Sequence, residues 1–159
     1  MPDSDYRQRL EQQKQASTLQ LLFKASRLAN ERALELVRAR SPDTRVRPAH
    51  TALFPHIDLE GTRQTVLASR LGISKQAVGQ LVDDLVAMGM VERVPDPDDA
   101  RARLVCFTAT GRLALLDGLA VLMQLQAELE GRLGAEVMHT LQQNLAALLS
   151  ALEEGTAPG

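Results

Sequence analysis

The sequence has little of several things that other classes of protein require. Its 159 residues include no Trp, one Cys and only 3% aromatic residues. A single Cys cannot form an internal disulfide, which excludes a disulfide-stabilised scaffold and is consistent with a reducing compartment. No apolar run approaches the roughly 20 residues that a membrane-spanning helix needs, and the acidic, polar residues 1–5 are unlike a secretory signal. We therefore expect a cytoplasmic protein with no membrane partner.

The sequence also lacks the short motifs that mark common enzyme classes. It contains no Gly-rich phosphate loop, no Cys/His metal spacing, no Gly-x-Ser-x-Gly elbow and no His-Glu-x-x-His. The histidines His50, His56 and His139 are too dispersed to suggest a metal site. We therefore expect that the protein is not an enzyme and uses neither a metal nor another cofactor.

The charges are distributed unevenly, although their sum is only −2. Residues 1–60 carry a net charge of +2 and residues 61–112 one of +1, whereas residues 113–159 carry −5. The distribution of charge says more about an anionic partner than the sum does. Such a partner is expected to contact the first two thirds of the chain and to avoid the last.

Helical periodicity dominates the ends of the chain. It predicts one long helix, straight or bent, over residues 5–40, followed by a basic linker that begins at residue 41. A second helix over residues 49–57 should be kinked or shortened by Pro55. Beyond Gly111 we expect a leucine-rich helix to about residue 130, and then an interruption at Gly131 and Gly134. The apolar stripe of a last helix comprises Val137, Leu141, Leu145, Leu148 and Leu152.

The middle of the chain predicts two short helices followed by a hairpin. A short strand at residues 62–64 precedes a helix over residues 65–71, and a second helix follows from Ser74 to about Met88. Its buried face is expected at i, i+3, i+4 and i+7, starting from Val78. Residues 91–94 and 103–107 are β-prone, and the polar run 95–100 between them is typical of a hairpin tip.

Two helices joined by a Gly turn form a helix-turn-helix, in which the first helix positions the second in a DNA major groove. Gln side chains can pair with base edges, Lys can contact guanine or phosphate, and free N–H groups at a helix start can bind phosphate. The hairpin would add a wing whose Arg enters the adjacent minor groove. The residues expected to enter the major groove are Ser74, Lys75, Gln76, Gly79 and Gln80.

Residues 48–111, about 40% of the chain, resemble the MarR family of bacterial winged-helix regulators. The matching segments are Leu67–Ser74, Leu85 with Gly89 and Val91–Arg93, and the wing signature Asp96–Thr108 followed by Gly111. The resemblance implies that Asp99 orients the wing and that Arg101 lies in the minor groove. Arg103, Arg63 and Arg70 are further candidates for phosphate contacts.

The resemblance also implies partners beyond double-stranded DNA. In the family, the terminal helices of two subunits interleave into a homodimer, and we expect this of residues 5–40 and 112–153. Small aromatic or anionic effectors often bind between the dimer helices and the DNA-binding head. The residues hypothesised to line such a cleft here are Phe23, Arg27, His50, Phe54 and His56.

The expected fold is mainly α with a small β-wing, a winged helix-turn-helix flanked by dimerisation helices. The expected parts are residues 1–47, an N-terminal helix and linker; 48–111, the DNA-binding domain; 112–154, C-terminal helices; and 155–159, a flexible tail. The sequence departs from the family at Ala77, Gln80 and Ala100, where hydroxyl or basic residues are common, so fewer phosphate contacts follow.

Other interpretations stay open at this point. Cys106 on a wing strand favours packing over redox sensing. The acidic side chains of Asp83 and Asp84 either position a neighbouring Arg or belong to an exposed face. The function expected is that of a sequence-specific regulator; repression is favoured, and activation stays an alternative that the sequence does not distinguish from it. The alternatives are a helical adaptor that binds protein and an architectural DNA-binding protein without an effector.

Overall fold

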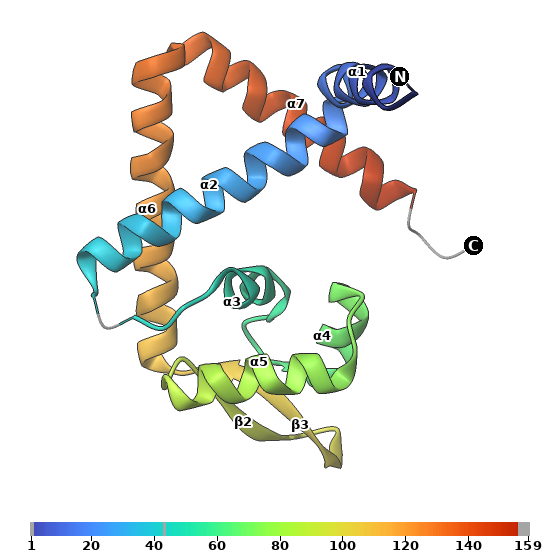
Figure 1. Ribbon diagram of the computed structural model, residues 1–159. Coiled ribbons are helices and arrows are strands. Elements are labelled where there is room, and N and C mark those ends of the chain that lie inside the picture. Colours follow the sequence, from blue (N-terminus) through green and yellow to red (C-terminus); the bar gives the residue numbers. More distant parts are fainter. Residues whose placement is uncertain (1, 43, 156–159) are drawn as a thin grey trace. The chain divides into compact units, whose positions relative to one another are not determined.

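The described chain is mostly helical, with one small antiparallel sheet (Figure 1). A computed structural model describes residues 2–42 and 44–155. Two compact units divide within a long helix, between Gly118 and Leu119. Among the described residues, no helix combines the length and apolar character needed to cross a membrane. The predicted fold class, mainly α with a β-wing, is confirmed.

The N-terminal region consists of two helices, α1 (Pro2–Ala16) and α2 (Thr18–Arg40). The prediction of one helix over residues 5–40 is wrong at Ser17, which has an extended backbone with φ −87° and ψ 111°. The Ser17 hydroxyl oxygen accepts a hydrogen bond from the Gln20 N–H at 3.3 Å. A serine side chain that caps a new helix in this way competes with continuation of the preceding one.

The segment after α2 leads into residues 48–107, called the head below. Helix α2 ends where Ser41 caps it, and α3 (Pro48–Leu53) begins with Pro48 in its first turn. The 3₁₀ helix η1 (Phe54–His56) follows and contains Pro55, which confirms that this proline shortens the α-helix, because proline cannot donate a backbone hydrogen bond.

The helix-turn-helix forms as the sequence predicts. It consists of α4 (Gln64–Leu71) and α5 (Lys75–Ala87), and the short strand β1 (Thr62–Arg63) directly precedes it. Gly72 ends α4 in the left-handed region, with φ 64°, where a side chain would cause strain. Ser74 caps α5, because its hydroxyl oxygen accepts from the Ala77 N–H at 3.1 Å.

The wing is a hairpin of β2 (Val91–Asp96) and β3 (Asp99–Phe107), and β3 lies between β1 and β2 in the sheet. Both strands are longer than predicted, so only Pro97 and Asp98 separate them. Pro95 pairs with Arg103, whereas Asp96 pairs with Asp99. The prediction that residues 95–100 form the hairpin tip is therefore too broad, and residues 100–102 form a bulge within β3.

The core of this head lies among α3, α4, α5 and the sheet, and α5 crosses the hairpin in Figure 1. Phe54 and Phe107 contribute a tilted aromatic pair with ring centroids 6.2 Å apart. The buried cluster comprises Leu34, Val46, Leu53, Ile57, Leu67, Ala68, Val78, Val82, Leu85, Met90, Val91, Val105 and Phe107. Their spacing explains why helix periodicity in the sequence located the two helices.

The second unit contains the end of α6 (Ala109–Leu133) and α7 (Ala135–Glu154). Gly131 does not interrupt α6, contrary to the prediction, whereas Gly134 separates the helices with φ +93°. Helix α7 has no buried residue. The residues of its apolar stripe are exposed, with fractions of 53% for Val137, 45% for Leu141 and 57% for Leu152. Beyond Gly155, the predicted tail lies outside the described residues.

The start of α6 is packed tightly against the start of β2. The Thr108 hydroxyl donates to the Gly89 carbonyl at 2.6 Å and accepts from the Gly111 N–H at 2.9 Å. A Cβ added at Gly111 would lie 1.8 Å from the Met90 carbonyl oxygen. Because that oxygen belongs to the backbone, rotating a side chain cannot relieve the clash.

We therefore expect Gly111→Ala to lower the free energy of unfolding by about 1–3 kcal/mol or more. The matched control is Gly118→Ala in the same helix, where nothing lies within 4 Å of the added Cβ. This control should gain about 0.5–1 kcal/mol from the helix propensity of Ala. Urea unfolding followed by circular dichroism, at one protein concentration, measures both. Equal stabilities would contradict the close approach at Gly111.

Candidate nucleic-acid interface

The first turns of α5 present polar side chains to solvent while the opposite face is buried. Val78, Val82 and Leu85 are fully buried. Because these positions share one face of the helix, the polar residues of the first two turns must point outward. The predicted major-groove residues with exposed side chains are Ser74, Lys75, Gln76 and Gln80.

Gly79 differs from these four residues, because it lies where α4 and α5 approach each other. A Cβ at Gly79 would be 2.9 Å from the Gln64 side-chain nitrogen. That nitrogen donates to the Lys75 carbonyl at 3.2 Å. The Gln64 amide thus connects α4 to the first turn of α5, and the structure gives Gly79 a packing role in addition to its predicted place at the groove.

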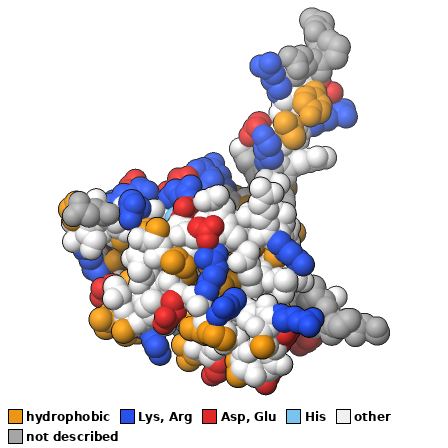
Figure 2. All heavy atoms as spheres, turned by 90° about the horizontal axis from the view of Figure 1, so that it is seen from below, with side chains coloured by type: hydrophobic (Ala, Val, Ile, Leu, Met, Phe, Trp, Pro, Cys, Tyr) orange, Lys and Arg blue, Asp and Glu red, His pale blue; other side chains and the backbone are white. Residues whose placement is uncertain are grey.

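Strand β3 of the wing presents two basic side chains, one within the bulge and one just after it. Arg101 and Arg103 are both exposed, and the Asp99 carboxylate accepts a hydrogen bond from the Arg101 backbone N–H at 3.0 Å. Asp99 therefore bonds to the backbone from which the Arg101 side chain projects; its wing-orienting role stays a prediction. Figure 2 shows the lower side of Figure 1, where α5 and the hairpin lie, and on this face Lys and Arg side chains are scattered among hydrophobic, acidic and other groups.

A buried carboxylate that the sequence analysis did not identify anchors the wing. The Asp96 side chain is only 5% exposed and accepts from Arg63 Nε at 2.5 Å. It also accepts from the Asp98 N–H at 2.9 Å, and Arg63 Nη1 lies 3.9 Å from the Asp99 carboxylate. The hydrogen bond from Arg63, with that from Asp98, lowers the pKa of Asp96, and Asp96 in turn raises the pKa of Arg63.

The Arg63 guanidinium, predicted as a phosphate contact, is thus bound to wing carboxylates. Arg63 ends β1, which pairs with β3, and this pairing places its side chain beside the wing carboxylates. No periodic pattern in the sequence marks Asp96, which stands in an acidic turn. Only the pairing of distant strands brings Arg63 beside it.

Arg70 is another predicted phosphate contact that the structure binds within the head. Its Nη1 donates to both Asp58 carboxylate oxygens, at 3.0 and 2.9 Å, and to the His56 carbonyl at 2.7 Å. The Thr62 hydroxyl and Arg70 together lower the pKa of Asp58. Arg70 therefore connects the end of α4 to the segment before β1.

Adjacent carboxylates of α5 bind arginines from two other segments. Asp83 forms an ion pair with Arg93 of β2 at 2.7 Å, and Asp84 forms one with Arg47. Both acidic side chains position a neighbouring Arg, which was one of the two interpretations of the sequence.

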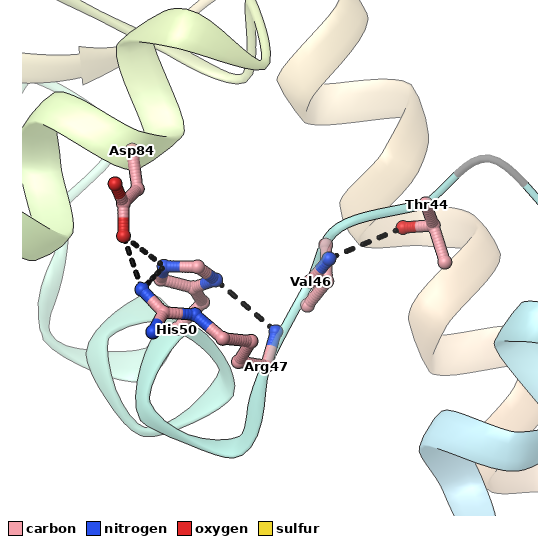
Figure 3. A network of polar contacts seen from close by, with 5 residues as sticks. All are labelled: Thr44, Val46, Arg47, His50 and Asp84. Atoms are coloured by element: carbon pink, nitrogen blue, oxygen red, sulfur yellow. Dashed lines mark hydrogen bonds and ion pairs between the residues drawn. The ribbon is translucent and has the colours of Figure 1, made fainter.

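His50 belongs to a polar network with Arg47 and Asp84, drawn in Figure 3. Its side chain is 1% exposed, its Nδ1 accepts from the Arg47 N–H at 3.1 Å, and its Nε2 lies 3.3 Å from the Asp84 carboxylate. Burial lowers the pKa of His50. The residues of this Arg47–His50–Asp84 network also line an open hollow together with Arg45, Ala87 and Met88.

The residues hypothesised to form an effector cleft have separate surroundings. Phe23 is 63% exposed on α2, and Arg27 donates to Glu31 at 2.7 Å. Phe54 packs against Phe107 in the core, and the backbone of His56 accepts from Arg70. Of the five, His50 alone lines the hollow just described. The contacts of the described residues do not bring the five side chains into one pocket.

Cys106 has the surroundings of a packing residue. Its thiol lies 3.7 Å from the Glu60 carbonyl, and a Cβ at Gly61 would be 2.4 Å from its sulfur. Burial, with the charge of Glu92, raises the pKa of the Cys106 thiol. A raised thiol pKa disfavours the reactive thiolate, which agrees with packing rather than redox sensing.

Comparison with known proteins gives a sequence match in the head and fold matches over most of the chain. Residues 48–102 match the sequence model of the MarR family. Wild-type apo MarR from E. coli has a similar structure, with a TM-score of 0.69 and 22% identity over 84% of this chain and 97% of that chain. No curated protein matches the sequence at a significant level.

Two further solved structures share this fold. A probable transcriptional regulator from Pseudomonas aeruginosa is 28% identical, with a TM-score of 0.56 over 78% of this chain and 93% of that chain. The transcriptional repressor CouR, solved with a 23-mer DNA duplex, is 24% identical, with a TM-score of 0.64 over 85% of this chain and 94% of that chain. The helices that flank the winged helix are thus part of the shared fold.

The Arg63–Asp96 contact predicts how the wing responds to loss of the buried charge. In Asp96→Asn, backbone amides of residues 95–103 should exchange with solvent faster than in wild type, because Arg63 loses its ionic partner. Asp98→Asn, an exposed neighbour, is the matched control and should exchange like wild type. Hydrogen exchange by mass spectrometry distinguishes the two, and equal exchange in all three proteins would refute the anchoring role. Because the pKa of Asp96 is lowered, its contribution is present above the ordinary Asp range and is lost as pH falls through the lowered value.

Proposed function

We propose that this chain, whose residues 48–102 form a MarR-family winged helix, is a homodimeric transcriptional regulator that acts by occluding an operator. The family is one of transcriptional regulators and not of enzymes, and the fold is that of its DNA-binding members. Beyond the family, we propose that the protein dimerises, represses transcription, recognises an operator and responds to an effector.

The observation that carries the proposal is the pairing of an exposed helix start with an exposed wing arginine. Lys75, Gln76 and Gln80 project from α5, and Arg101 projects from the bulge in β3. Gln can form two hydrogen bonds with the major-groove edge of adenine, Lys can contact guanine or phosphate, and Arg suits the narrow minor groove. The backbone N–H groups at the start of α5 add a phosphate contact. The similar fold of CouR, solved with a DNA duplex, supports this assignment.

The apolar stripe of the flanking helix α7 supports a homodimer. Within the second unit, α7 buries none of its residues, although it carries an apolar stripe. Apolar stripes of this length on a soluble protein usually bind a partner. A symmetric dimer would place two α5 helices in major grooves one helical turn apart, roughly 34 Å, on a pseudo-palindromic operator.

Such a dimer would repress transcription by covering its operator in the cytoplasm. A small aromatic or anionic effector that binds one head-to-head spacing more tightly than the other would shift the dimer away from DNA. The basic hollow lined by Arg45, Arg47 and His50 is compatible with an anionic compound, although the hypothesised set with Phe23 is not assembled there.

DNA binding is tested with purified protein and duplexes from the region upstream of its own gene. Fluorescence anisotropy at several salt concentrations should show preferential binding that weakens linearly in log–log form as salt rises. Arg101→Ala should lose about 1–3 kcal/mol of binding free energy while its thermal unfolding is unchanged. The control Arg9→Ala removes the same charge from α1 and should bind like wild type.

Each alternative function predicts a different result in the same experiment. An adaptor that binds protein would show no DNA affinity and no effect of Arg101→Ala. An architectural DNA-binding protein would bind all duplexes equally. Either result would overturn the proposed regulator.

The dimer is tested by sedimentation equilibrium. Wild type should have twice the mass of one chain, whereas replacing an apolar residue of the α7 stripe by a charge, Leu145→Glu, should yield monomers. A neighbouring exposed polar position off the stripe, Gln143→Glu, is the matched control and should remain dimeric. A monomeric wild type at micromolar concentration would contradict the proposed assembly.

A further inference from the structure

The Arg47–His50–Asp84 network joins three segments of the head that are distant in sequence. Arg47 ends the segment that leaves α2, His50 lies on α3, and Asp84 lies on α5 (Figure 3). One residue earlier, Val46 is buried in the core, and its N–H donates to the Thr44 hydroxyl at 3.5 Å. Val46 thus anchors the connection from α2 in the core, and Arg47, the next residue, binds Asp84 of α5.

The protonation state of His50 follows from its partners. The Arg47 backbone N–H is a donor, so the Nδ1 atom that it contacts at 3.1 Å must be an unprotonated acceptor. The proton of the neutral ring then resides on Nε2, which donates to the Asp84 carboxylate at 3.3 Å. His50 therefore caps α3 with one nitrogen and contacts α5 with the other.

Asp84 lies on the same rigid helix as the predicted base-contacting residues. It follows Gln80 by one turn and Gln76 by two, so a movement of α5 at Asp84 moves both glutamines. The Asp84 carboxylate receives the Arg47 guanidinium and the His50 Nε2–H together. These contacts fix the α5 orientation relative to the segment that comes from α2.

We propose that the Arg47–His50–Asp84 network is a positioning element for DNA binding, which orients the recognition helix α5 and is complete only while His50 is neutral. The inference rests on the proposed DNA-binding function. Neither Asp84 nor His50 needs to contact DNA, because Asp84 would be repelled by phosphate and the His50 side chain is 1% exposed. Polar contacts around a buried side chain such as His50 contribute to one specific geometry more than to stability.

Protonation of His50 breaks the network from within. The added proton on Nδ1 faces the Arg47 N–H, which is also a donor, and the charged ring lies 3.4 Å from the Arg47 guanidinium. The charged groups around the ring are Asp84 from α5, Arg47 beside it and Arg45 at the same hollow. Because burial lowers the pKa of His50, its contribution to stability is present above the ordinary histidine value and is lost as pH falls below it.

The first test compares Asp84 with a carboxylate of the head outside the network, that of Glu92 on β2, which is exposed. Asp84→Asn and Glu92→Gln each remove one negative charge, so electrostatics alone should leave both variants binding as tightly as wild type or tighter. If the network positions α5, Asp84→Asn should instead bind the preferred duplex roughly twofold to thirtyfold more weakly, the range of coupling that residues outside a binding site carry. The slope of affinity against salt should not change, because no phosphate contact is removed.

Fluorescence anisotropy at pH 7.5 measures the affinity of each variant for the duplex. Thermal unfolding of each variant checks that it is folded. Weakened binding by Asp84→Asn alone, in a folded protein, supports the inference. Equal or tighter binding by both variants overturns it.

The second test uses pH and does not depend on removing a charge. Wild-type affinity for the duplex should fall between pH 7.5 and pH 5.5, by no more than about tenfold for each subunit of the proposed dimer, the limit for one histidine of ordinary pKa whose charged form cannot bind. His50→Asn retains an acceptor for the Arg47 N–H but cannot be protonated, so its affinity should depend less on pH. His139→Asn, an exposed histidine of α7, is the matched control and should behave like wild type.

The outcomes separate the inference from the function on which it rests. Wild type that binds no duplex preferentially at pH 7.5 contradicts the proposed regulator itself. Preferential binding with the same pH dependence in wild type and His50→Asn contradicts only the positioning role. A pH dependence that His50→Asn reduces and His139→Asn retains supports it.

Discussion

Burial of one face of α5 is the constraint on which the rest of the head depends. Val78, Val82 and Leu85 are fully buried against the core, together with Leu53 and Leu67 from the preceding helices. Burying a side chain of this size contributes about 1.5–3 kcal/mol, so rotating α5 would expose several such side chains at once. The helix therefore has one allowed rotation, and its polar first turns necessarily face solvent.

Arginine–carboxylate contacts supplement this apolar core by connecting elements that the core does not orient. Arg63 binds the wing, Arg70 binds the segment before β1, Arg93 binds α5 from β2, and Arg47 binds α5 from the α2 side. Arg has a planar group with several donors, which suits such directional contacts. Four basic residues are thus used within the head, which leaves Lys75, Arg101 and Arg103 as its exposed basic residues at α5 and the wing.

The separation of paired arginines from exposed basic residues explains how a protein of net charge −2 can still be proposed to bind DNA. The carboxylates of Asp83, Asp84 and Asp96 are paired with arginines, which reduces their negative potential around Lys75, Arg101 and Arg103. It also explains why counting basic residues in the sequence overestimates the phosphate contacts. Arg63 and Arg70 were counted among them, although the structure places both against carboxylates.

The sequence by itself determined the helix-turn-helix, its capping Ser74, the turn at Gly72, the hairpin and the exposed face of α5. These features depend on residues within a few positions of one another, where helix periodicity, capping and turn preferences act. The sequence also placed Arg101 and Asp99 on the wing through their resemblance to a known signature. The break at Ser17 was missed, because a serine within a helical pattern is compatible with both outcomes.

Only the tertiary structure decided which charged residues are paired. Asp96 with Arg63 and Asp84 with Arg47 and His50 are separated by more than thirty residues, so no local pattern could show them. The same holds for Gly79, whose packing against Gln64 depends on how two helices cross. Periodicity shows which residues face inward, whereas partners across the chain depend on the strand pairing and helix packing that folding creates.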